Sequence, residues 1–181
     1  MSPQPGVPVL RQAVLDTTEV RALAEFYRRL LDLQYRPGDE HPGADAPDPR
    51  GQDWLVLRRL DGSTALAFQK VEQLPSATWP NGPHPQMLHL DLTVPNRVEL
   101  DAAHQRALAL GAQVLMDRSD DEEEPLWVYA DLAGHPSCIF VVPAWWLSHH
   151  HWPGERALEL QGGADPRSAP PPSQHRKRIG N

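Results

Sequence analysis

A histidine, an aspartate and a threonine alternate with apolar residues in one short segment, residues 87–94. Strict alternation is the pattern of a β-strand with one buried face, so His89, Asp91 and Thr93 should point to one side of the strand. An imidazole next to a carboxylate can bind a ligand, transfer a proton or hold a metal ion. The apolar residues between them should pack beneath a helix.

For His89 we favour a pocket-facing imidazole that is hydrogen-bonded to a neighbour or a ligand, and the alternative is a metal ligand. Asp91 could act as a general base, bind a ligand donor, or remain a solvated carboxylate at a strand end. The same alternation in the first strand directs Gln12, Val14 and Asp16 inward. A solvated carboxylate is favoured more strongly for Asp16 than for Asp91.

Three aromatic residues on predicted hairpin strands, Trp54, Trp127 and Tyr129, offer flat contact area for a planar ligand, or else pack in the core. The single cysteine, Cys138, is more typical of a small buried residue than of a ligand or nucleophile, because no partner base is identifiable. Adjacent residues rarely chelate one ion with good geometry, so the triplet at 149–151 is predicted to be solvated.

These residues need a framework, and the chain supplies two similar halves. Residues 1–8 are rich in proline and indicate a flexible N-terminus. The first half, residues 9–74, has the patterns of a strand, an amphipathic helix and a hairpin with its turn at Asp61-Gly62. These elements are predicted at 9–16, after Thr17-Thr18, at 53–59 and at 64–71. Residues 75–86 form a linker, because their many prolines exclude a packed helix or central strand.

The second half, residues 87–143, repeats this order. Asn96 with Glu99 resembles a capping box, and Gly111 is the residue type preferred just past a helix end. Three strands follow and are predicted at 112–116, 126–131 and 137–142. An acidic loop separates the first two, and a type I turn from Asp131 to Gly134 separates the last two.

Aligning His89 with Gln12, an offset of 77 (89 − 12), brings the apolar positions of both helices into one register. It also relates Trp54 with Val56 to Trp127 with Tyr129. A repeat at a fixed offset indicates two copies of one supersecondary unit. We therefore predict an α+β protein with two tandem strand-helix-strand-strand-strand (βαβββ) modules.

The segments at 14–16 and 21–31 in the first half, and at 88–92, 109–112 and 131–136 in the second, resemble the vicinal oxygen chelate superfamily. This superfamily contains glyoxalases, bleomycin-resistance proteins and extradiol dioxygenases, and the resemblance is to its glyoxalase-like domain. It covers about three quarters of the chain. It implies a cupped eight-stranded mixed sheet with the helices outside, enclosing one small-molecule cavity.

Active members of this superfamily take four metal ligands from the first and last strands of the two modules. Transferred by position, these sites fall on Gln12, Gln69, His89 and Cys138. Only His89 is a standard ligand, and neutral amides bind divalent ions weakly compared with glutamate. The resemblance therefore implies no standard catalytic metal as cofactor, or a weakly held, atypical divalent ion.

The composition restricts the partners and the location. Asp and Glu outnumber Lys and Arg by 24 to 17, which argues against nucleic-acid binding and favours a neutral or cationic small-molecule ligand. No apolar run approaches the roughly 18 residues that span a bilayer, so no membrane partner is expected. A lone cysteine and the lack of a signal-peptide pattern predict a cytoplasmic protein.

Beyond the second half, residues 144–161 are predicted to dock as a C-terminal extension through Trp145, Trp146 and Trp152. If these tryptophans are exposed instead, they indicate a homodimer contact. Residues 162–181 have too little apolar content to fold and are predicted to be disordered.

The leading functional prediction is a protein of the bleomycin-resistance kind, which binds or sequesters an aromatic or cationic compound without a standard catalytic metal. The alternative is a lyase, isomerase or dioxygenase with an atypical metal or with an acid–base site centred on His89. A third is a regulatory module with a vestigial cavity. The ligand, any reaction, the oligomeric state and the pairing of modules within or between chains stay open.

Overall fold

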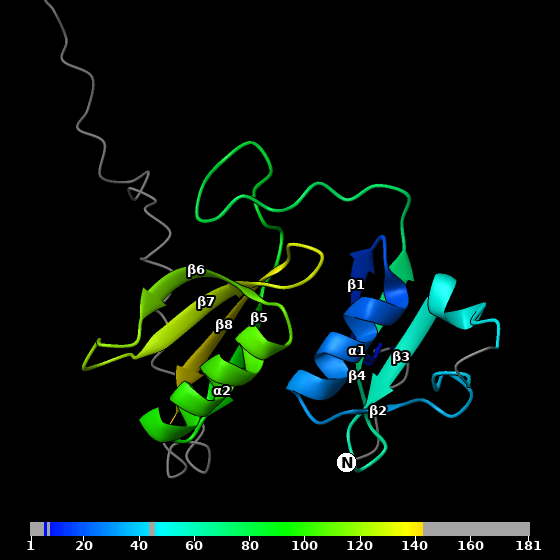
Figure 1. The fold of residues 1–181 in the computed structure, drawn as a ribbon, viewed down its shortest axis with the longest axis horizontal. Coiled ribbons are helices and arrows are strands. Elements are labelled where there is room, and N and C mark those ends of the chain that lie inside the picture. Colours follow the sequence, from blue (N-terminus) through cyan, green and yellow to red (C-terminus); the bar gives the residue numbers. More distant parts are fainter. Residues whose placement is uncertain (1–5, 7, 44–45, 143–181) are drawn as a thin grey trace, which may run out of the picture. The chain divides into compact units, whose positions relative to one another are not determined.

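The computed structural model describes residue 6, residues 8–43 and residues 46–142 (Figure 1). Both predicted modules lie in one compact unit of the chain. The predictions for 144–161, 162–181 and the histidine triplet fall outside the described residues. None of the described helices is long and apolar enough to cross a membrane.

The first module consists of one helix and four strands in the predicted βαβββ order. Its elements are β1 (Ala13–Thr17), α1 (Val20–Leu30), β2 (Gln34–Tyr35), β3 (Trp54–Arg58) and β4 (Thr64–Lys70), with a short 3-10 helix, η1 (Arg50–Gln52), before β3. The strands form a mixed sheet in the order β1-β4-β3-β2, in which only β1 and β4 are parallel.

The second module repeats this arrangement (Figure 1). Its elements are β5 (Leu90–Val94), α2 (Arg97–Ala109), β6 (Gln113–Arg118), β7 (Leu126–Ala130) and β8 (Pro136–Val141). The strand order β5-β8-β7-β6 again has one parallel pair, β5 with β8. The prediction of tandem α+β modules is confirmed, and the described strands form two four-stranded sheets.

The spacing between equivalent elements also agrees with the predicted repeat. Strands β1 and β5 begin at Ala13 and Leu90, and helices α1 and α2 begin at Val20 and Arg97. Both pairs are therefore 77 positions apart (90 − 13 and 97 − 20).

Strand register corrects one part of the predicted alignment. In the first sheet Leu15 pairs with Phe68, which pairs with Leu55. In the second sheet the equivalent of Leu15 is Leu92, which pairs with Ile139. Ile139 in turn pairs with Trp127. Leu55, and not Trp54, is thus the counterpart of Trp127, and the predicted equivalence is wrong by one position.

The boundaries of α2 follow the predicted signals. The Asn96 side chain accepts a hydrogen bond from the backbone N–H of Glu99 (3.0 Å), which satisfies one of the free donors at the helix start. The helix ends at Ala109, and Gly111 has a φ of 100°, which favours glycine. α1 lacks a side-chain hydrogen bond from its N-cap, Glu19.

Two strands begin later than predicted. β1 starts at Ala13, and Val9 and Leu10 are 77% and 91% exposed. β5 starts at Leu90, and Met87 is fully exposed. Both predictions extended into segments whose apolar side chains are exposed and so do not support a strand.

The turn between β7 and β8 is built on Asp131 and Gly134, as predicted. The N–H of Gly134 donates to the carbonyl of Asp131 (3.1 Å), and the Asp131 carboxylate accepts from the N–H groups of Ala133 and His135 (2.8 and 2.9 Å). Gly134 has a φ of 90°, and a Cβ there would lie 2.7 Å from the hydroxyl of Ser76 in the linker. The turn therefore needs glycine for its backbone and for the linker that passes over it.

Apolar residues form two clusters. The larger one lies beneath the helices and contains residues of both modules, among them Leu23, Phe68, Leu100 and Ile139. The smaller one lies on the opposite face of the second sheet and consists of Leu126, Val128, Phe140 and Val142, packed against Trp79, Met116 and Cys138.

The modules contact each other through the larger cluster and through hydrogen bonds of Tyr27 and Arg106. The Tyr27 hydroxyl of α1 donates to the Asp131 carboxylate (2.8 Å), and Arg106 Nε of α2 donates to the carbonyl of Arg29 (2.8 Å). Burial, together with the charge of Asp131, raises the pKa of Tyr27 well above its usual value. The tyrosine therefore keeps its proton and remains a donor to the carboxylate.

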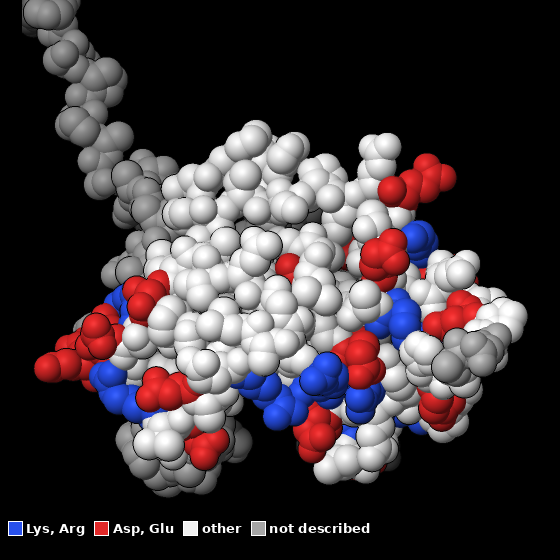
Figure 2. All heavy atoms as spheres, in the orientation of Figure 1, with Lys and Arg blue, Asp and Glu red and all other residues white. Residues whose placement is uncertain are grey.

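Charged residues are mixed on the face that Figure 2 shows. Lysine and arginine side chains alternate there with aspartate and glutamate along the edges, and the central area carries few charges (Figure 2).

Candidate functional site

The second module brings together three of the predicted site residues. His89, directly before β5, Asp91 on β5 and Cys138 on β8 each place one donor atom within 4.8 Å of the other two. His89 Nε2 lies 3.1 Å from Asp91 Oδ1. Asp91 and Cys138 are paired residues on neighbouring parallel strands, so their side chains leave the sheet on the same face.

These three side chains differ in exposure and protonation. The side chain of His89 is 25% exposed and that of Asp91 is 46% exposed. Burial, with smaller contributions from Asp91 and Glu124, raises the pKa of the Cys138 thiol to about 12. The raised pKa favours the neutral thiol over the thiolate, and the cysteine is partly buried.

A linker tryptophan, Trp79, borders this group. Its ring lies edge-on to the His89 ring with the centroids 6.4 Å apart, and it packs against the small apolar cluster that includes Cys138. Its buried Nε1 has no hydrogen-bond partner among the described residues. Sequence reasoning missed Trp79 because it treated the proline-rich linker as a spacer.

The first module carries a second group of predicted residues on the corresponding face. Gln69 on β4 pairs with Asp16 on β1 and with Trp54 on β3, which places these three side chains side by side on one face of the sheet. Gln69 and Asp16 are exposed, and Trp54 is half-buried. Gln12 lies just before β1, and its buried Oε1 has no partner in the described part of the chain.

The other two predicted aromatic residues lie on the wrong face for this site. Trp127 stacks on His104 of α2 with the ring centroids 3.9 Å apart, and His104 Nδ1 lies 2.9 Å from the Tyr129 hydroxyl. Trp127 and Tyr129 therefore pack beneath the helix, opposite Cys138. Their assignment to the pocket is corrected, because the one-position error in the hairpin alignment reversed the face.

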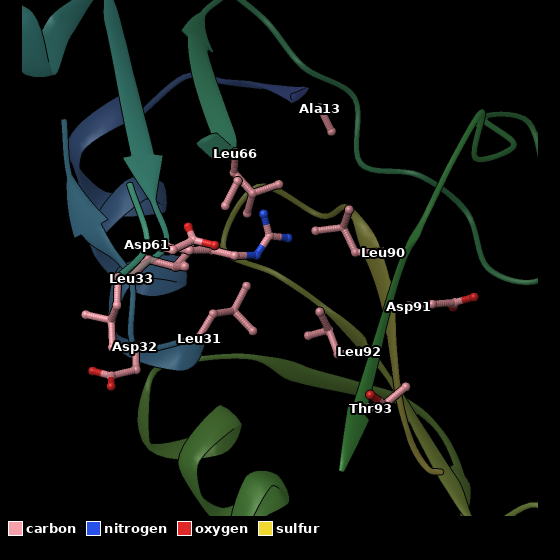
Figure 3. A pocket seen from close by; sticks show the side chains of 13 residues that line it. Ala13, Leu31, Asp32, Leu33, Asp61, Leu66, Leu90, Asp91, Leu92 and Thr93 are labelled. Atoms are coloured by element: carbon pink, nitrogen blue, oxygen red, sulfur yellow. The ribbon is translucent and has the colours of Figure 1, made fainter. Parts of the chain in front are cut away.

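Figure 3 makes the alternation along β5 visible. Leu90 and Leu92 point into an apolar pocket of about 750 Å³ that is also lined by Leu31 and Leu66 (Figure 3). The Asp91 side chain points away from these leucines. The strand thus places its leucines on the helix side and its polar side chains on the open side, as the sequence pattern indicates.

The four positions transferred from the superfamily are not equivalent under the repeat. Gln69 pairs with Asp16 in the first sheet, whereas Cys138 pairs with Asp91 in the second. With the offset of 77, the counterpart of Asp91 is Val14, which pairs with Ala67. Ala67 is therefore the counterpart of Cys138 in the first module, and an alanine side chain cannot bind a metal ion.

A divalent ion fits the second module better than the first. Zinc ligands lie about 2.0 to 2.3 Å from the metal, and the donor atoms of His89, Asp91 and Cys138 are close enough to surround one such ion. Nitrogen, oxygen and sulfur donors together suit a borderline ion such as Zn²⁺. Gln12 and Gln69 add only neutral amides. His89 was predicted as the only standard ligand at the four family positions, and Asp91 lies outside those positions.

The sequence of residues 12–140 matches the family described as "Glyoxalase-like domain". No curated protein matches the sequence.

Several solved structures share the fold. A glyoxalase/dioxygenase from Nostoc punctiforme has a TM-score of 0.54 and 17% identity, over 79% of this chain and 97% of its own. The fosfomycin resistance protein FosX from Listeria monocytogenes has a TM-score of 0.52 and 12% identity, over 75% and 92%. A glyoxalase/bleomycin resistance protein/dioxygenase family enzyme from Burkholderia phytofirmans has a TM-score of 0.51 and 14% identity, over 73% and 97%. At these identities the likeness shows the fold alone.

Proposed function

Because the chain belongs to the glyoxalase-like domain family of the vicinal oxygen chelate superfamily, we propose that it binds a small aromatic or cationic molecule without a standard catalytic metal. The observation that carries this proposal is the donor set on the open faces of the two sheets. Gln12 and Gln69 are neutral amides and Cys138 is a protonated thiol, which leaves His89 as the one standard ligand at the family positions.

The charge of these faces favours a cation. Asp16 and Asp91 are accessible carboxylates on the first strands of the two modules, and the chain as a whole has a formal net charge of −7. An ammonium group beside either carboxylate would gain a charge-assisted hydrogen bond.

The aromatic residues favour a planar part of the ligand. Trp54 lies beside Gln69 in the first module, and Trp79 lies beside His89 in the second. Indole rings provide large contact area, and their faces attract cations. The structural relatives include a fosfomycin resistance protein and members of a bleomycin resistance group, which supports a small organic ligand.

The test uses tag-free protein in which the triplet His149–His151 is changed to alanine. Metal bound by the triplet then cannot contribute to the measured metal content or to the thermal shift. Thermal-shift screening compares a library of aromatic amines with a series of divalent ions. We expect stabilisation by organic ligands in the presence of a chelator. Stoichiometric Ni, Zn, Fe or Mn in the purified protein, or stabilisation only after metal is added, would contradict the proposal.

Charge-removing variants locate the binding face. For the ligand that the screen selects, Asp16→Asn and Asp91→Asn should each weaken binding about tenfold, because each removes a charge-assisted hydrogen bond. Asp120→Asn, in the exposed acidic loop, is the matched control and should leave affinity unchanged. Equal affinities for all three variants would contradict the placement of the ligand.

A second candidate function is metal-assisted catalysis, and the proximity of His89, Asp91 and Cys138 is the observation that favours it. A bound divalent ion would act as a Lewis acid there. Co²⁺ titration tests the ion site directly, because thiolate coordination gives a near-ultraviolet charge-transfer band. The band should appear with the wild type and disappear with Cys138→Ala. If no band appears with the wild type, this candidate is excluded.

A further inference from the structure

A separate pocket of about 560 Å³ lies between β1, the end of the linker and the turn between β7 and β8. We call it the turn pocket. Its lining is mainly apolar, with Val14, Leu15, Leu74 and Met87 among its walls. The polar residues that line it are Asp16, His84, Gln86 and His135, and neither lysine nor arginine is among its lining residues.

His135 is held in one orientation by a buried carboxylate. Its Nδ1 lies 2.9 Å from Asp131 Oδ2, and the Asp131 side chain is fully buried. An ionised carboxylate only accepts hydrogen bonds, so Nδ1 donates to it, and in the neutral ring Nε2 is left as an acceptor. Nε2 has no hydrogen-bond partner among the described residues.

Two contacts hold Asp131 itself in place. Tyr27 donates to the same carboxylate from the other module, and backbone N–H groups of the turn donate to its second oxygen. With its partners fixed in this way, His135 has little freedom to turn its ring. The histidine is therefore positioned by the fold before any ligand arrives.

Gln86 supplies a second acceptor without a partner. Its Oε1 is buried and forms no hydrogen bond within the described part of the chain. A buried acceptor that is left unpaired destabilises the folded protein. A donor bound in the turn pocket would remove this destabilisation.

We propose that the turn pocket binds a small amphipathic amine, with its ammonium group donating to Gln86 Oε1, His135 Nε2 and the Asp16 carboxylate. A primary ammonium has three donors and a positive charge, which suits two neutral acceptors and one carboxylate. Its apolar part contacts the valine, leucine and methionine side chains. The Asp16 carboxylate is shared with the function proposed above, whereas His135 and Gln86 take no part in it.

The experiment uses the full-length ¹⁵N-labelled protein and three probes of one shape: phenethylamine, 2-phenylethanol and phenylacetate. Phenethylamine should give saturable NMR shifts of the Gln86 side-chain amide and of the backbone amides of Ala133, Gly134 and His135. The alcohol should bind at least about tenfold more weakly. Phenylacetate should produce no shifts, because its carboxylate would face only acceptors.

Two variants test the assigned atoms. His135→Asn keeps a donor toward Asp131 and removes the acceptor at the Nε2 position, and Gln86→Leu removes the unpaired oxygen while keeping the side chain's approximate size. Each should weaken phenethylamine binding about tenfold. His135→Gln, which places an amide near the Nε2 position, should restore part of it. Gln113→Leu, at an exposed position of β6, is the matched control.

Several outcomes would overturn the proposal: no saturable shifts up to about 10 mM phenethylamine, equal shifts from all three probes, or unchanged affinity in both variants. Shifts centred on His89 and lost in His89→Ala would show that the amine occupies the site proposed above instead. Intact binding in His89→Ala supports the turn pocket as a separate site. Unchanged unfolding temperatures of His135→Asn and Gln86→Leu show that the losses are local.

Discussion

The two modules share one backbone pattern and differ in the side chains on the sheet face opposite the helix. At positions 77 residues apart, the first module has Gln12 and Val14 where the second has His89 and Asp91. The second module therefore carries the group of imidazole, carboxylate and thiol. Duplication of a supersecondary unit preserved the backbone and let the chemistry of each copy change separately.

The first module has a buried carboxylate in the loop between β2 and β3. Asp39 in this loop is fully buried, accepts from the backbone N–H of Val56 (3.0 Å), and is paired with Arg36 and Arg50. Nearby, Arg21 of α1 forms a two-pronged ion pair with Asp48 (2.7 and 2.9 Å). The second module has its buried carboxylate, Asp131, in the turn between β7 and β8, whereas its candidate site contains the accessible carboxylate of Asp91.

The largest expected effect concerns the buried carboxylate of Asp39 in the first module. Asp39→Ala should lower the free energy of unfolding by about 3 to 5 kcal/mol, because it leaves the buried N–H of Val56 and the guanidinium groups of Arg36 and Arg50 without their acceptor. Denaturant-induced unfolding, followed by circular dichroism, measures the change. Glu25→Ala, which breaks the exposed pair with Arg28, is the control and should cost less than about 1 kcal/mol. Similar small losses in both variants would show that the loop does not depend on Asp39.

The contact between the modules should have the next largest effect. Tyr27→Phe should cost about 1 to 3 kcal/mol, because the buried Asp131 loses a donor. Burial raises the pKa of Tyr27 in the folded state above its usual value of 10.0, so its contribution is complete below about pH 10 and is lost as the pH rises further. The stability difference between wild type and variant should therefore shrink in alkaline solution. A difference that stays constant up to pH 11 would contradict this assignment.

The helix starts offer a smaller contrast between the modules. Asn96→Ala removes the side-chain cap of α2 and should cost about 1 kcal/mol, whereas Glu19→Ala at the uncapped start of α1 should stay within about 0.5 kcal/mol. Urea unfolding of the two variants, side by side, measures the difference. Equal losses would mean that the caps do not distinguish the modules.

The smallest expected effect concerns the candidate site. Asp91→Asn should change the free energy of unfolding by less than about 0.5 kcal/mol, because Asp91 is half exposed and supports no buried donor. Thermal unfolding in the absence of ligand measures this change. A loss of unfolding free energy near that of Asp39→Ala would mean that Asp91 stabilises the fold and that the two carboxylates do not differ in this way.

Local signals were enough to predict the two α-helices, most of the strands and the repeat, but they placed no strand at β2. The Asn96 cap, the Asp131–Gly134 turn and the alternation in β5 depend on neighbouring residues, and all three are present. The face of Trp127 was not predictable in the same way, because a one-position error in aligning two hairpins reverses every side chain. Register depends on hydrogen bonds to another strand, which the local pattern does not specify.

The contacts of the loops and the linker were beyond the sequence patterns. Asp39 lies in a segment that composition identifies only as a loop, and two of its partners, Arg50 and Val56, are 11 and 17 positions away along the chain. Trp79 lies among prolines, and its packing beside His89 depends on how the linker returns to the second sheet. The proximity of Asp91 to Cys138 likewise follows from the pairing of β5 with β8.

The shared cluster beneath the helices and the hydrogen bond between Tyr27 and Asp131 connect the modules independently of the linker. A chain cut within the linker should therefore reassemble from its two fragments. Such a reconstituted protein permits isotope labelling of one fragment at a time. Spectra of the two halves can then be recorded without overlap.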